Sequence, residues 1–566
     1  MTAAEGPSPQ FQSLVVLTPT NQSDDHSTVQ IHREMDFDSE KLIHMAAGPL
    51  MGIVVYKMGS FSEDRKSDVE LSFSVGISDG LKTKQERRRL DFYMRPDVTA
   101  GREIVHAFFR QLVNNLPSDY TSFLKKILVL MQKGFYEIER VGVDFKMVAE
   151  EEKVVIPEAA QYDSSSEVEE VTAGHVQEVL EHAYPNGLTI DLISEALRCT
   201  AEEATKYLLE LEAAGIVRRV DDEWIRVDTR NVDAVTQQKY AGSSSGHPTV
   251  AIITCLFVEK QAVDALIEDS SVIHKYKSGG DSNIYTLGRI GTHRVVATKL
   301  AIIGDSREAI TSAGSITTRL LGNFQHIEHV FVVGIGGAVP HFTDASLHAR
   351  LGDVIVSARR PDAYVYSHDL IVDRKTEVLT GFAVRKWNPE SIIVEQTVLE
   401  KDGEIRNDWN DLTAKAVKKL NDESGDLDFS APDPSTDILA IPAAGGQMMV
   451  IPHPNQQRKG FQIHLGSVGA MANLKKLATE SAENDEDNIG QIRERFSNEY
   501  HLRALDVGFD SVVAAIVGSR IDSWALIRGV ADYQHGQSRA SRKWQAHAAA
   551  RAAAMTRAII ERLPPI

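Results

Sequence analysis

Alternation of apolar and polar residues predicts an α+β domain over residues 11–147. Three segments are β-branched or alternate between apolar and polar positions, as strands do: Ser13–Leu17, Gly52–Met58 and Val69–Ile77. Two helices are expected to follow, over Ala100–Asn115 and Tyr120–Arg140. The second helix places its apolar residues on one face: Phe123, Leu124, Ile127, Leu128, Met131, Phe135 and Ile138.

Polar stretches in this part of the chain are expected to lie outside the regular elements. Residues 1–10 and 19–30 are predicted to be irregular. The basic run Lys82–Arg89, KTKQERRR, offers positive charge for an anion. Because charge runs more often form a solvated face, we interpret it as a helix start or a loop.

Two stretches without an apolar period separate the remaining domains. Residues 149–170 contain EEEK and SSSEVEE, a composition that predicts an acidic linker. Residues 229–248 end in AGSSSGHP, which predicts a flexible linker. Residues 171–228 between them predict three helices and a hairpin: Ala173–Ala183, Ile190–Leu197, Thr200–Gly215, Ile216–Val220 and Glu223–Val227. This order resembles a winged-helix domain.

The charge of the winged-helix-like segment argues against DNA binding. Residues 171–228 hold twelve acidic and five basic residues, a net charge of −7. Its third helix begins with a capping box formed by Thr200 and Glu203. Among its charged residues, Lys206 is the one cation against four acidic residues: Glu202, Glu203, Glu210 and Glu212. Phosphates repel such a helix, so we expect a protein partner or a spacer role instead of DNA recognition.

From residue 249 to residue 563 the pattern changes to alternating strands and helices, which is the α/β signature. Expected strands cover Thr249–Cys255, Val295–Ile302, Val330–Val333, Leu351–Ser357 and Trp524–Ile527. Expected helices cover Lys260–Ile267 and the segment from Arg307 to Leu321. The fold class of this half is therefore α/β, and it is preceded by the winged-helix-like and α+β domains.

Composition narrows the classes of function and the compartment. The formal net charge of −19 argues against a general affinity for nucleic acid or for an anionic membrane. Two cysteines, Cys199 and Cys255, are too few for a disulfide framework and favour a reducing compartment. We see neither a signal peptide nor an apolar run long enough for a membrane span, so a cytoplasmic protein is expected.

Two carboxylates fall where α/β proteins build their sites, just beyond the carboxyl ends of strands. Glu259 follows the first expected strand, although a glutamate that starts a helix often only complements the helix dipole. Asp532 follows the strand at Trp524–Ile527, and a buried carboxylate is costly unless it is paired or used. Between them in sequence, the run Gly334, Ile335, Gly336 and Gly337 is expected to form a turn whose amides approach a ligand closely.

Several motifs in this half resemble the purine nucleoside phosphorylase and nucleosidase superfamily. They are DSNIYTLGRIG (Asp281–Gly291), TTRLLGNF (Thr317–Phe324), VVGIGGAVPHFTD (Val332–Asp344), RLGDVIVS (Arg350–Ser357), HLGSVGA (His464–Ala470), IRGVADY (Ile527–Tyr533) and the following Trp544–Gln545. The resemblance is closest to the large multidomain branch found in animals and in microbial antiviral systems, some of whose members cleave ATP to adenine and ribose triphosphate.

The resemblance implies a role for each of the two carboxylates. Asp532 matches the aspartate that protonates purine N7 so that the base can leave, and Arg528 matches the arginine of the same motif. Glu259 matches the glutamate that orients and deprotonates the attacking water in the hydrolases of the superfamily. Both roles are general acid–base catalysis.

Hydrolysis is favoured over phosphorolysis by the residues at two loops. Phosphorylases of the superfamily carry an arginine in the first loop and another before the glycine segment, whereas this chain has Glu259 and Val332–Val333 there. A phosphate nucleophile therefore lacks its usual clamp. Arg307 and Arg319 lie nearby in sequence and either hold the phosphates of a substrate or pair with surface acids.

The segment Ala504–Asp510 departs from the family pattern. Gly508 stands where the family has a glutamate that grips two ribose hydroxyls. Losing such a charge-assisted contact costs about 2–4 kcal/mol in the transition state. Asp506 and Asp510 are candidates to compensate, because residues 506, 508 and 510 share one face of an extended segment. Met471, where a glycine is common, is expected to pack against the base.

The sequence thus predicts an N-glycosidase that hydrolyses the base–ribose bond of a purine nucleoside or nucleotide, ATP-like substrates included. The alternative is a catalytically impaired member that senses a nucleotide or binds a protein partner. No cofactor is expected, and no His/Cys/Asp spacing indicates a metal, since His341, His368 and Asp369 are predicted to lie in loops and His453 in a turn. The resemblance also implies the architecture of this half, a mixed sheet flanked by helices in three layers, and a homo-oligomer, a dimer or larger.

Overall fold

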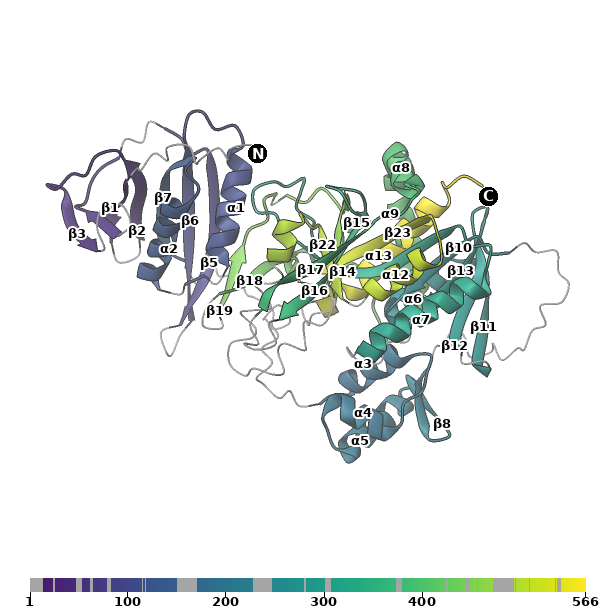
Figure 1. Ribbon diagram of the computed structural model, residues 1–566. Coiled ribbons are helices and arrows are strands. Elements are labelled where there is room, and N and C mark those ends of the chain that lie inside the picture. The colour runs from purple at the N-terminus through teal and green to yellow at the C-terminus, as the bar shows by residue number, and fades with distance from the viewer. Residues whose placement is uncertain are drawn as a thin grey trace. The chain divides into compact units, whose positions relative to one another are not determined.

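The computed structural model divides into two compact units, and each is described by itself (Figure 1). It describes residues 14–565 except 24–25, 47–52, 62–64, 79–82, 115, 118, 150–170, 228–246, 279–280, 301–306, 373–378, 424–425, 444–446, 456, 472–492, 494, 508, 535 and 537–540. The first unit contains residues 1–162, 341–348 and 438–458, and the second contains the rest of the chain.

The first unit is built on a mixed sheet of nine strands within the described residues, in the order β18-β19-β5-β6-β7-β2-β1-β4-β3. Its N-terminal strands are β1 (Leu14–Gln22), β2 (His26–Glu34), β3 (Leu42–Ala46), β4 (Ile53–Tyr56), β5 (Val69–Ser78), β6 (Thr83–Met94) and β7 (Ile138–Met147). Helices α1 (Gly101–Val113) and α2 (Tyr120–Lys133) bury one face each, including Phe108, Phe109, Phe123 and Ile127. The α+β character expected for this region is present.

Three local predictions in this unit were wrong. The predicted helix to Arg140 ends at Lys133, because Gly134 closes it and Ile138 begins β7. Residues 19–30, expected to be irregular, contain the paired ends of β1 and β2. The basic run belongs to β6, where Arg88 is fully buried and pairs with Glu86 at 2.7 Å. Long-range strand pairing decided all three, and local composition does not encode it.

A hairpin from the second half of the chain completes the first unit. Strands β18 (Leu439–Ala443) and β19 (Gln447–Ile451) pair with each other, and β19 pairs with β5 at Met449↔Val75. Met449 is fully buried. Residues 341–348 also belong to this unit, where the rings of His341 and His106 stack at 3.7 Å. Segments far apart in the sequence therefore share one core.

The second unit includes the winged-helix domain. Its helices are α3 (Ala173–Ala183), α4 (Ile190–Leu197) and α5 (Ala201–Ala213), followed by the hairpin β8 (Val217–Val220) and β9 (Glu223–Arg226). The predicted capping box is present, with Thr200 and Glu203 bonded reciprocally. The element order predicted for this segment is confirmed, with ends that differ by at most two residues.

The larger part of the second unit is a mixed sheet of twelve strands within the described residues, with helices on both faces. Its strands are β10 (Val250–Thr254), β11 (Glu268–Ser278), β12 (Asp281–Ile290), β13 (His293–Lys299), β14 (His329–Ala338), β15 (Val354–Ser357), β16 (Val365–Val372), β17 (Leu379–Trp387), β20 (Ile463–Gly466), β21 (Val468–Met471), β22 (Ala504–Val507) and β23 (Ser523–Asp532). Its helices are α6 (Phe257–Asp264), α7 (Arg307–Asn323), α8 (Ile393–Glu400), α9 (Asp402–Glu423), α12 (Asp510–Gly518) and α13 (Arg542–Ile560).

Alternate residues of the central strands enter different cores. Val250 and Ile252 pack with α6, α8, α9 and α13, whereas Ala251 and Ile253 pack with α7 and α12. This alternation explains why β10 reads as continuously apolar, because both of its faces are covered. Strands β13, β10, β14 and β23 run parallel to one another, so their carboxyl ends meet at one edge of the sheet.

Three predictions about the local backbone structure in this unit were wrong. Gly334–Gly337 was expected to form a turn but lies inside β14 and is buried. His368 and Asp369 lie in β16 instead of a loop. Asp510 is the first residue of α12, so it does not continue the extended segment of Asp506. Among the described residues, no helix has the length and apolar character needed to cross a membrane.

Candidate functional site

The Glu259 carboxylate is held at the edge where β10 and β14 end. Glu259 lies in the first turn of α6 and is 4% exposed. Its Oε2 accepts hydrogen bonds from the amides of Cys255 (2.9 Å) and Leu256 (2.8 Å). Its Oε1 accepts a third bond from the amide of Ile335 at 2.8 Å. One carboxylate thus joins the start of α6 to the glycine segment of β14.

Gly334 makes this approach possible. A Cβ atom at position 334 would lie 2.3 Å from Oε1 of Glu259 and 2.7 Å from its Cδ. Any side chain there would displace the carboxylate. The glycine segment therefore brings strand backbone against a catalytic candidate, which is a different use from the turn expected of it.

Asp506 and Arg528 form a buried ion pair beside Glu259. Arg528 Nε donates to Asp506 Oδ2 at 2.7 Å, and both side chains are nearly fully buried. Arg528 Nη1 donates to the carbonyl of Val332 at 2.8 Å, and the Phe509 ring lies 5.0 Å from the guanidinium carbon. The arginine thus ties β14, β22 and β23 together.

Burial controls the protonation of this group. Burial raises the pKa of Glu259, and Arg528 and the three amides oppose that rise. Burial also raises the pKa of Asp506 to about 7, although Arg528 lowers it, and the nearby Glu259 charge adds to the rise. The Glu259 and Asp506 carboxylates both lie near the Arg528 guanidinium. Protonation of either carboxylate therefore removes the repulsion between their negative charges. Burial raises the pKa of the neighbouring Cys255 thiol to about 12, so it stays neutral.

Asp532 is the last residue of β23 and is 2% exposed. Its Oδ1 accepts hydrogen bonds from the amides of Gln534 and Gly536, each at 2.8 Å. Gly536 has a φ of 84°, and a Cβ there would lie 2.5 Å from Cα of Gly336. The loop after Asp532 therefore folds back onto the glycine segment. In the register of β14 and β23, Gly334 lies beside Arg528 and Gly337 beside Asp532.

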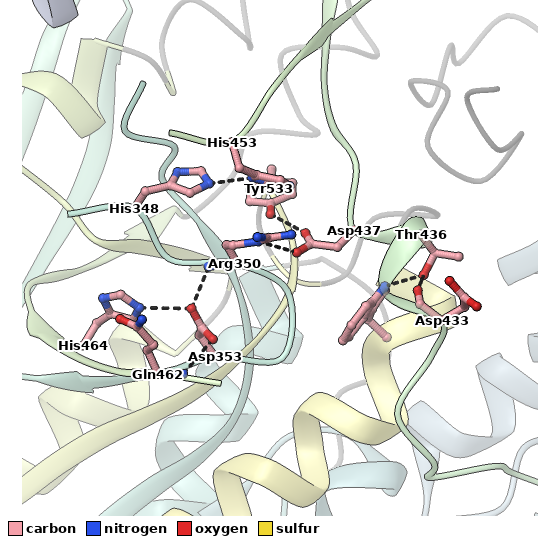
Figure 2. A network of polar contacts seen from close by, with 11 residues as sticks. His348, Arg350, Asp353, Asp433, Thr436, Asp437, His453, Gln462, His464 and Tyr533 are labelled. Carbon is pink, nitrogen blue, oxygen red and sulfur yellow. Dashed lines mark hydrogen bonds and ion pairs between the residues drawn. The ribbon is translucent and has the colours of Figure 1, made fainter. Parts of the chain in front are cut away.

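A second polar network fixes the exit of β23 (Figure 2). The Tyr533 hydroxyl donates to Asp437 Oδ1 at 2.6 Å, and Arg350 Nε donates to Asp437 Oδ2 at 2.7 Å. Burial and the Asp437 charge raise the pKa of Tyr533 well above its usual range. The Tyr533 phenol therefore stays protonated and keeps donating, which anchors the residue next to Asp532.

Asp353 extends this network to the neighbouring strands (Figure 2). Its Oδ2 accepts from the amide of Arg350 at 2.9 Å and contacts His464 Nε2 at 3.1 Å, and its Oδ1 accepts from the amide of Gln462 at 2.9 Å. Both Asp353 and His464 are buried. This arrangement explains why the RLGD and HLG segments carry polar residues inside a core.

The remaining predicted residues lie on other elements or have side chains outside the described part of the molecule. Arg319 is exposed on α7, and Asp510 starts α12 half-buried. Arg307 is the first residue of α7 and Met471 the last of β21, and their side chains lie outside the described part of the molecule. Gly508, on which the departure from the family pattern rests, also lies outside the described residues. Within the described residues, no group of three or more His, Cys, Asp or Glu side chains is arranged to hold a metal ion.

Sequence reasoning missed the partner that links Arg350 to Tyr533. Both residues stood in motifs that were noted, but Asp437 lies 87 positions after Arg350 in a segment without a motif. In the sequence, Asp437 is marked only as a polar residue directly after the short 3₁₀ helix Pro434–Thr436. The ion pair between Asp506 and Arg528 was missed in the same way, although both residues had been singled out.

A cavity of about 470 Å³ lies in the first unit at the start of α1. Its lining includes three arginines and three acids: Arg65, Arg95, Arg102, Asp68, Glu103 and Asp344. It contains none of the predicted site residues. Equal numbers of basic and acidic side chains give it no preference for an anion, so the chemistry argues for the edge of the β14 sheet instead.

Comparisons with known proteins match these parts of the chain. A winged helix-turn-helix domain model matches residues 162–228. A nucleotide-binding leucine-rich repeat (NLR)-like protein of Hyaloscypha variabilis is 25% identical over 292 residues, which is 50% of this chain. The match covers 26% of that relative, so the chain spans about a quarter of its length.

Solved nucleosidase structures cover somewhat more than half of the chain at low similarity. The 5′-methylthioadenosine/S-adenosylhomocysteine nucleosidase of Neisseria meningitidis is 12% identical with a TM-score of 0.33, covering 55% of this chain and 98% of that one. The S-adenosylhomocysteine nucleosidase of Streptococcus pyogenes is 15% identical with a TM-score of 0.33, covering 57% and 100%. The futalosine hydrolase of Helicobacter pylori is 10% identical with a TM-score of 0.32, covering 56% and 97%.

Proposed function

We propose that residues 249–563 form an N-glycosidase that hydrolyses the base–ribose bond of a purine nucleoside or nucleotide. The observation that carries this proposal is the placement of two buried carboxylates, Glu259 and Asp532, on either side of the glycine segment of β14. Both follow parallel strands at the edge where α/β sheets bind ligands. The sequence motifs that resemble the nucleosidase superfamily lie in the same strands.

Each carboxylate has a place in a balanced hydrolysis. Asp532 donates a proton to N7 of the purine as the bond between the base nitrogen and C1′ breaks, so the base leaves neutral. Glu259 accepts a proton from the water whose oxygen bonds to C1′. The products are the free base and the ribose or ribose phosphate. The positive charge that develops on the sugar is stabilised by carboxylates in a dry site.

The Arg528 pairing supports hydrolysis over phosphorolysis. Its guanidinium belongs to the strand residue paired with Gly334, and it is bound by Asp506 and by the carbonyl of Val332. A phosphate nucleophile would compete with a carboxylate 2.7 Å away for this charge. Water needs no such cation, and Glu259 lies in reach of the same edge.

A nucleotide-sensing role is the second candidate. It is favoured by the three amides that already bind the Glu259 carboxylate, since a carboxylate used as a helix cap is a weaker base than an unbonded one. The NLR-like relative is also far longer than this chain, and its name includes nucleotide binding. In this reading the pocket binds the purine without turnover.

Base release from purified full-length protein separates the two candidates. The substrates are ATP, AMP, adenosine, inosine and methylthioadenosine, with free base measured by chromatography and binding measured by calorimetry. Release from at least one substrate is expected. Binding without release from any of them would establish the sensing role instead.

Asp532→Asn and Glu259→Gln test the two assigned roles. The asparagine keeps an acceptor oxygen for the amides of Gln534 and Gly536, so only the transferable proton is lost. We expect base release to fall by about 10²–10⁴-fold in each variant. Glu202→Gln, an exposed carboxylate of α5, is the matched control and should leave the rate unchanged. Full activity in Asp532→Asn would remove Asp532 from the mechanism.

A further inference from the structure

The winged-helix domain packs directly behind the helix that carries Glu259. Tyr184, at the end of α3, is 4% exposed, and its ring meets the Phe257 ring edge-on at 5.0 Å and 81°. Phe257 is the first residue of α6 and lies two positions before Glu259. Tyr184, Phe257 and Ile284 form one buried apolar cluster. Through this contact the winged-helix domain therefore packs against the first turn of α6.

Arg226 closes this contact from the other side. Its guanidinium carbon lies 4.7 Å from the centre of the Phe257 ring. Its Nε donates to Glu181 of α3 at 3.0 Å, and its Nη2 donates to Asp426, which lies in the nucleosidase-like part. Gln177 also donates to Asp426 at 3.2 Å. The Arg226 guanidinium lies against the Phe257 ring while Glu181 and Asp426 accept its hydrogen bonds. These directional contacts fix the docking geometry more closely than an apolar contact alone would.

Lys299 adds a buried polar link at the same place. It ends β13, beside Thr254 at the end of β10. Its Nζ donates to the carbonyls of His182 (2.9 Å), Tyr184 (3.0 Å) and Leu300 (3.0 Å). Two of these three acceptors belong to the winged-helix domain. Burial lowers the pKa of Lys299 to about 8, and the charge of Glu259 opposes that shift, which places the ammonium in electrostatic reach of the Glu259 carboxylate.

We propose that the winged-helix domain acts as a built-in positioning element of the Glu259 site, and that Tyr184, Arg226 and Lys299 are positioning residues. Docking fixes Phe257, and Phe257 fixes the turn whose Cys255 and Leu256 amides hold the carboxylate. A partner that pulls the domain away from α6 would release Glu259 and switch the site off. This inference rests on the proposed function for its effect on turnover, but not for its effect on structure.

The opposite face of the domain is left for that partner. On α5, Glu202, Lys206, Leu209 and Glu210 are exposed, and Leu209 has an exposed fraction of 54%. The acidic side chains repel nucleic acid phosphates. A protein with a basic surface fits this face better than DNA, so the regulating ligand belongs to the protein class.

Amide hydrogen exchange in the full chain tests the positioning without any assay of activity. In Tyr184→Ala we expect the Cys255 and Leu256 amides to exchange at least about tenfold faster, because their acceptor is no longer held in place. Asp426→Asn perturbs the docking from the other side without touching the winged-helix core, and should have the same effect. Tyr184→Phe keeps the ring, so the Cys255 and Leu256 amides should stay as protected as in the wild type. Leu209→Ala, exposed on α5, is the control and should leave these amides unchanged.

Turnover completes the test. If the wild type releases base, Tyr184→Ala and Asp426→Asn should lower kcat at least tenfold with little change in KM, since the substrate pocket itself is untouched. Faster exchange in a chain that releases no base would refute the proposed hydrolysis while upholding the positioning role. Unchanged exchange at Cys255 and Leu256 in both variants would overturn the inference, whether or not the chain is active.

Discussion

At the scale of single residues, the cluster of Glu259, Asp506 and Arg528 contains two buried carboxylates but one buried guanidinium. Glu259 and Asp506 each bring a carboxylate near one guanidinium, that of Arg528. Such a group is costly to bury unless a proton or hydrogen bonds offset the second negative charge. Backbone amides do this for Glu259, whereas Asp506 has its pKa raised to about 7. The site therefore exchanges a proton with solvent near neutral pH.

Asp506 makes folding stability depend on pH in a direction opposite to that of most carboxylates. Its pKa rises from 3.8 in the unfolded chain to about 7 in the folded protein, chiefly through burial. The folded state keeps the proton between these values, so the free energy of unfolding should fall as pH rises from about 4 to about 7 and should level off above that, where both states are ionised. Asp506→Asn should remove this slope.

Urea unfolding at pH 5, 6, 7 and 8 measures the difference. The wild type should lose stability relative to Asp506→Asn as pH increases, because its carboxyl is as uncharged as the asparagine at pH 5 and becomes ionised toward pH 8. Asp402→Asn, an exposed carboxylate on α9, is the control and should follow the wild type. Parallel curves for wild type and Asp506→Asn would show that Asp506 is ionised throughout.

At the scale of elements, helix α6 and the loop after β23 both approach the glycines of β14. Gly334 receives the Glu259 carboxylate of α6, and Gly336 receives the loop that follows β23 through Gly536. A strand with ordinary side chains would hold these elements further apart. The close approach is what brings the Glu259 carboxylate and the Asp532 loop to neighbouring positions of one strand.

Gly334→Ala should disrupt the site because the new methyl group would lie 2.3 Å from Oε1 of Glu259. We expect a loss of about 1–3 kcal/mol in the free energy of unfolding, together with faster exchange of the Leu256 amide. Gly403→Ala is the matched control, since a Cβ at position 403 meets open space on α9 and alanine favours a helix. Equal stability of the two variants would mean that Glu259 moves aside without cost.

At the scale of the whole molecule, the two units are interleaved along the chain. The first unit takes residues 341–348 and 438–458 from within the region that otherwise builds the second. The hairpin of β18 and β19 covers the edge of β5, which would otherwise present unpaired backbone groups. The two units therefore cannot be separated by a single cut of the chain.

Met449→Asp tests whether the hairpin stabilises the first unit. Met449 is fully buried beside Val75 of β5. A buried carboxylate there should cost at least about 2 kcal/mol, which corresponds to roughly 30-fold faster exchange of the β5 amides. The amides of β14, in the second unit, should not change. Val450→Thr, at the next and half-buried position, is the control; equal acceleration in both units would contradict the assignment of the hairpin.

The sequence by itself determined the elements that local patterns encode. Caps and helical periodicity located the three winged-helix helices, and continuous apolar strands between helices identified the α/β half. Glu259 and Asp532 were found because they lie at or shortly after the ends of apolar strands, and that relation is local in sequence. The roles assigned to them remain predictions.

Only the tertiary structure decided which distant residues meet. The Asp506–Arg528 pair, the link from Arg350 through Asp437 to Tyr533, and the docking of Tyr184 on Phe257 join segments far apart in the sequence. The same holds for the hairpin that completes the first unit and for the basic run that became β6. Such pairings depend on burial and strand register, which arise when the whole chain packs and leave no trace in local composition.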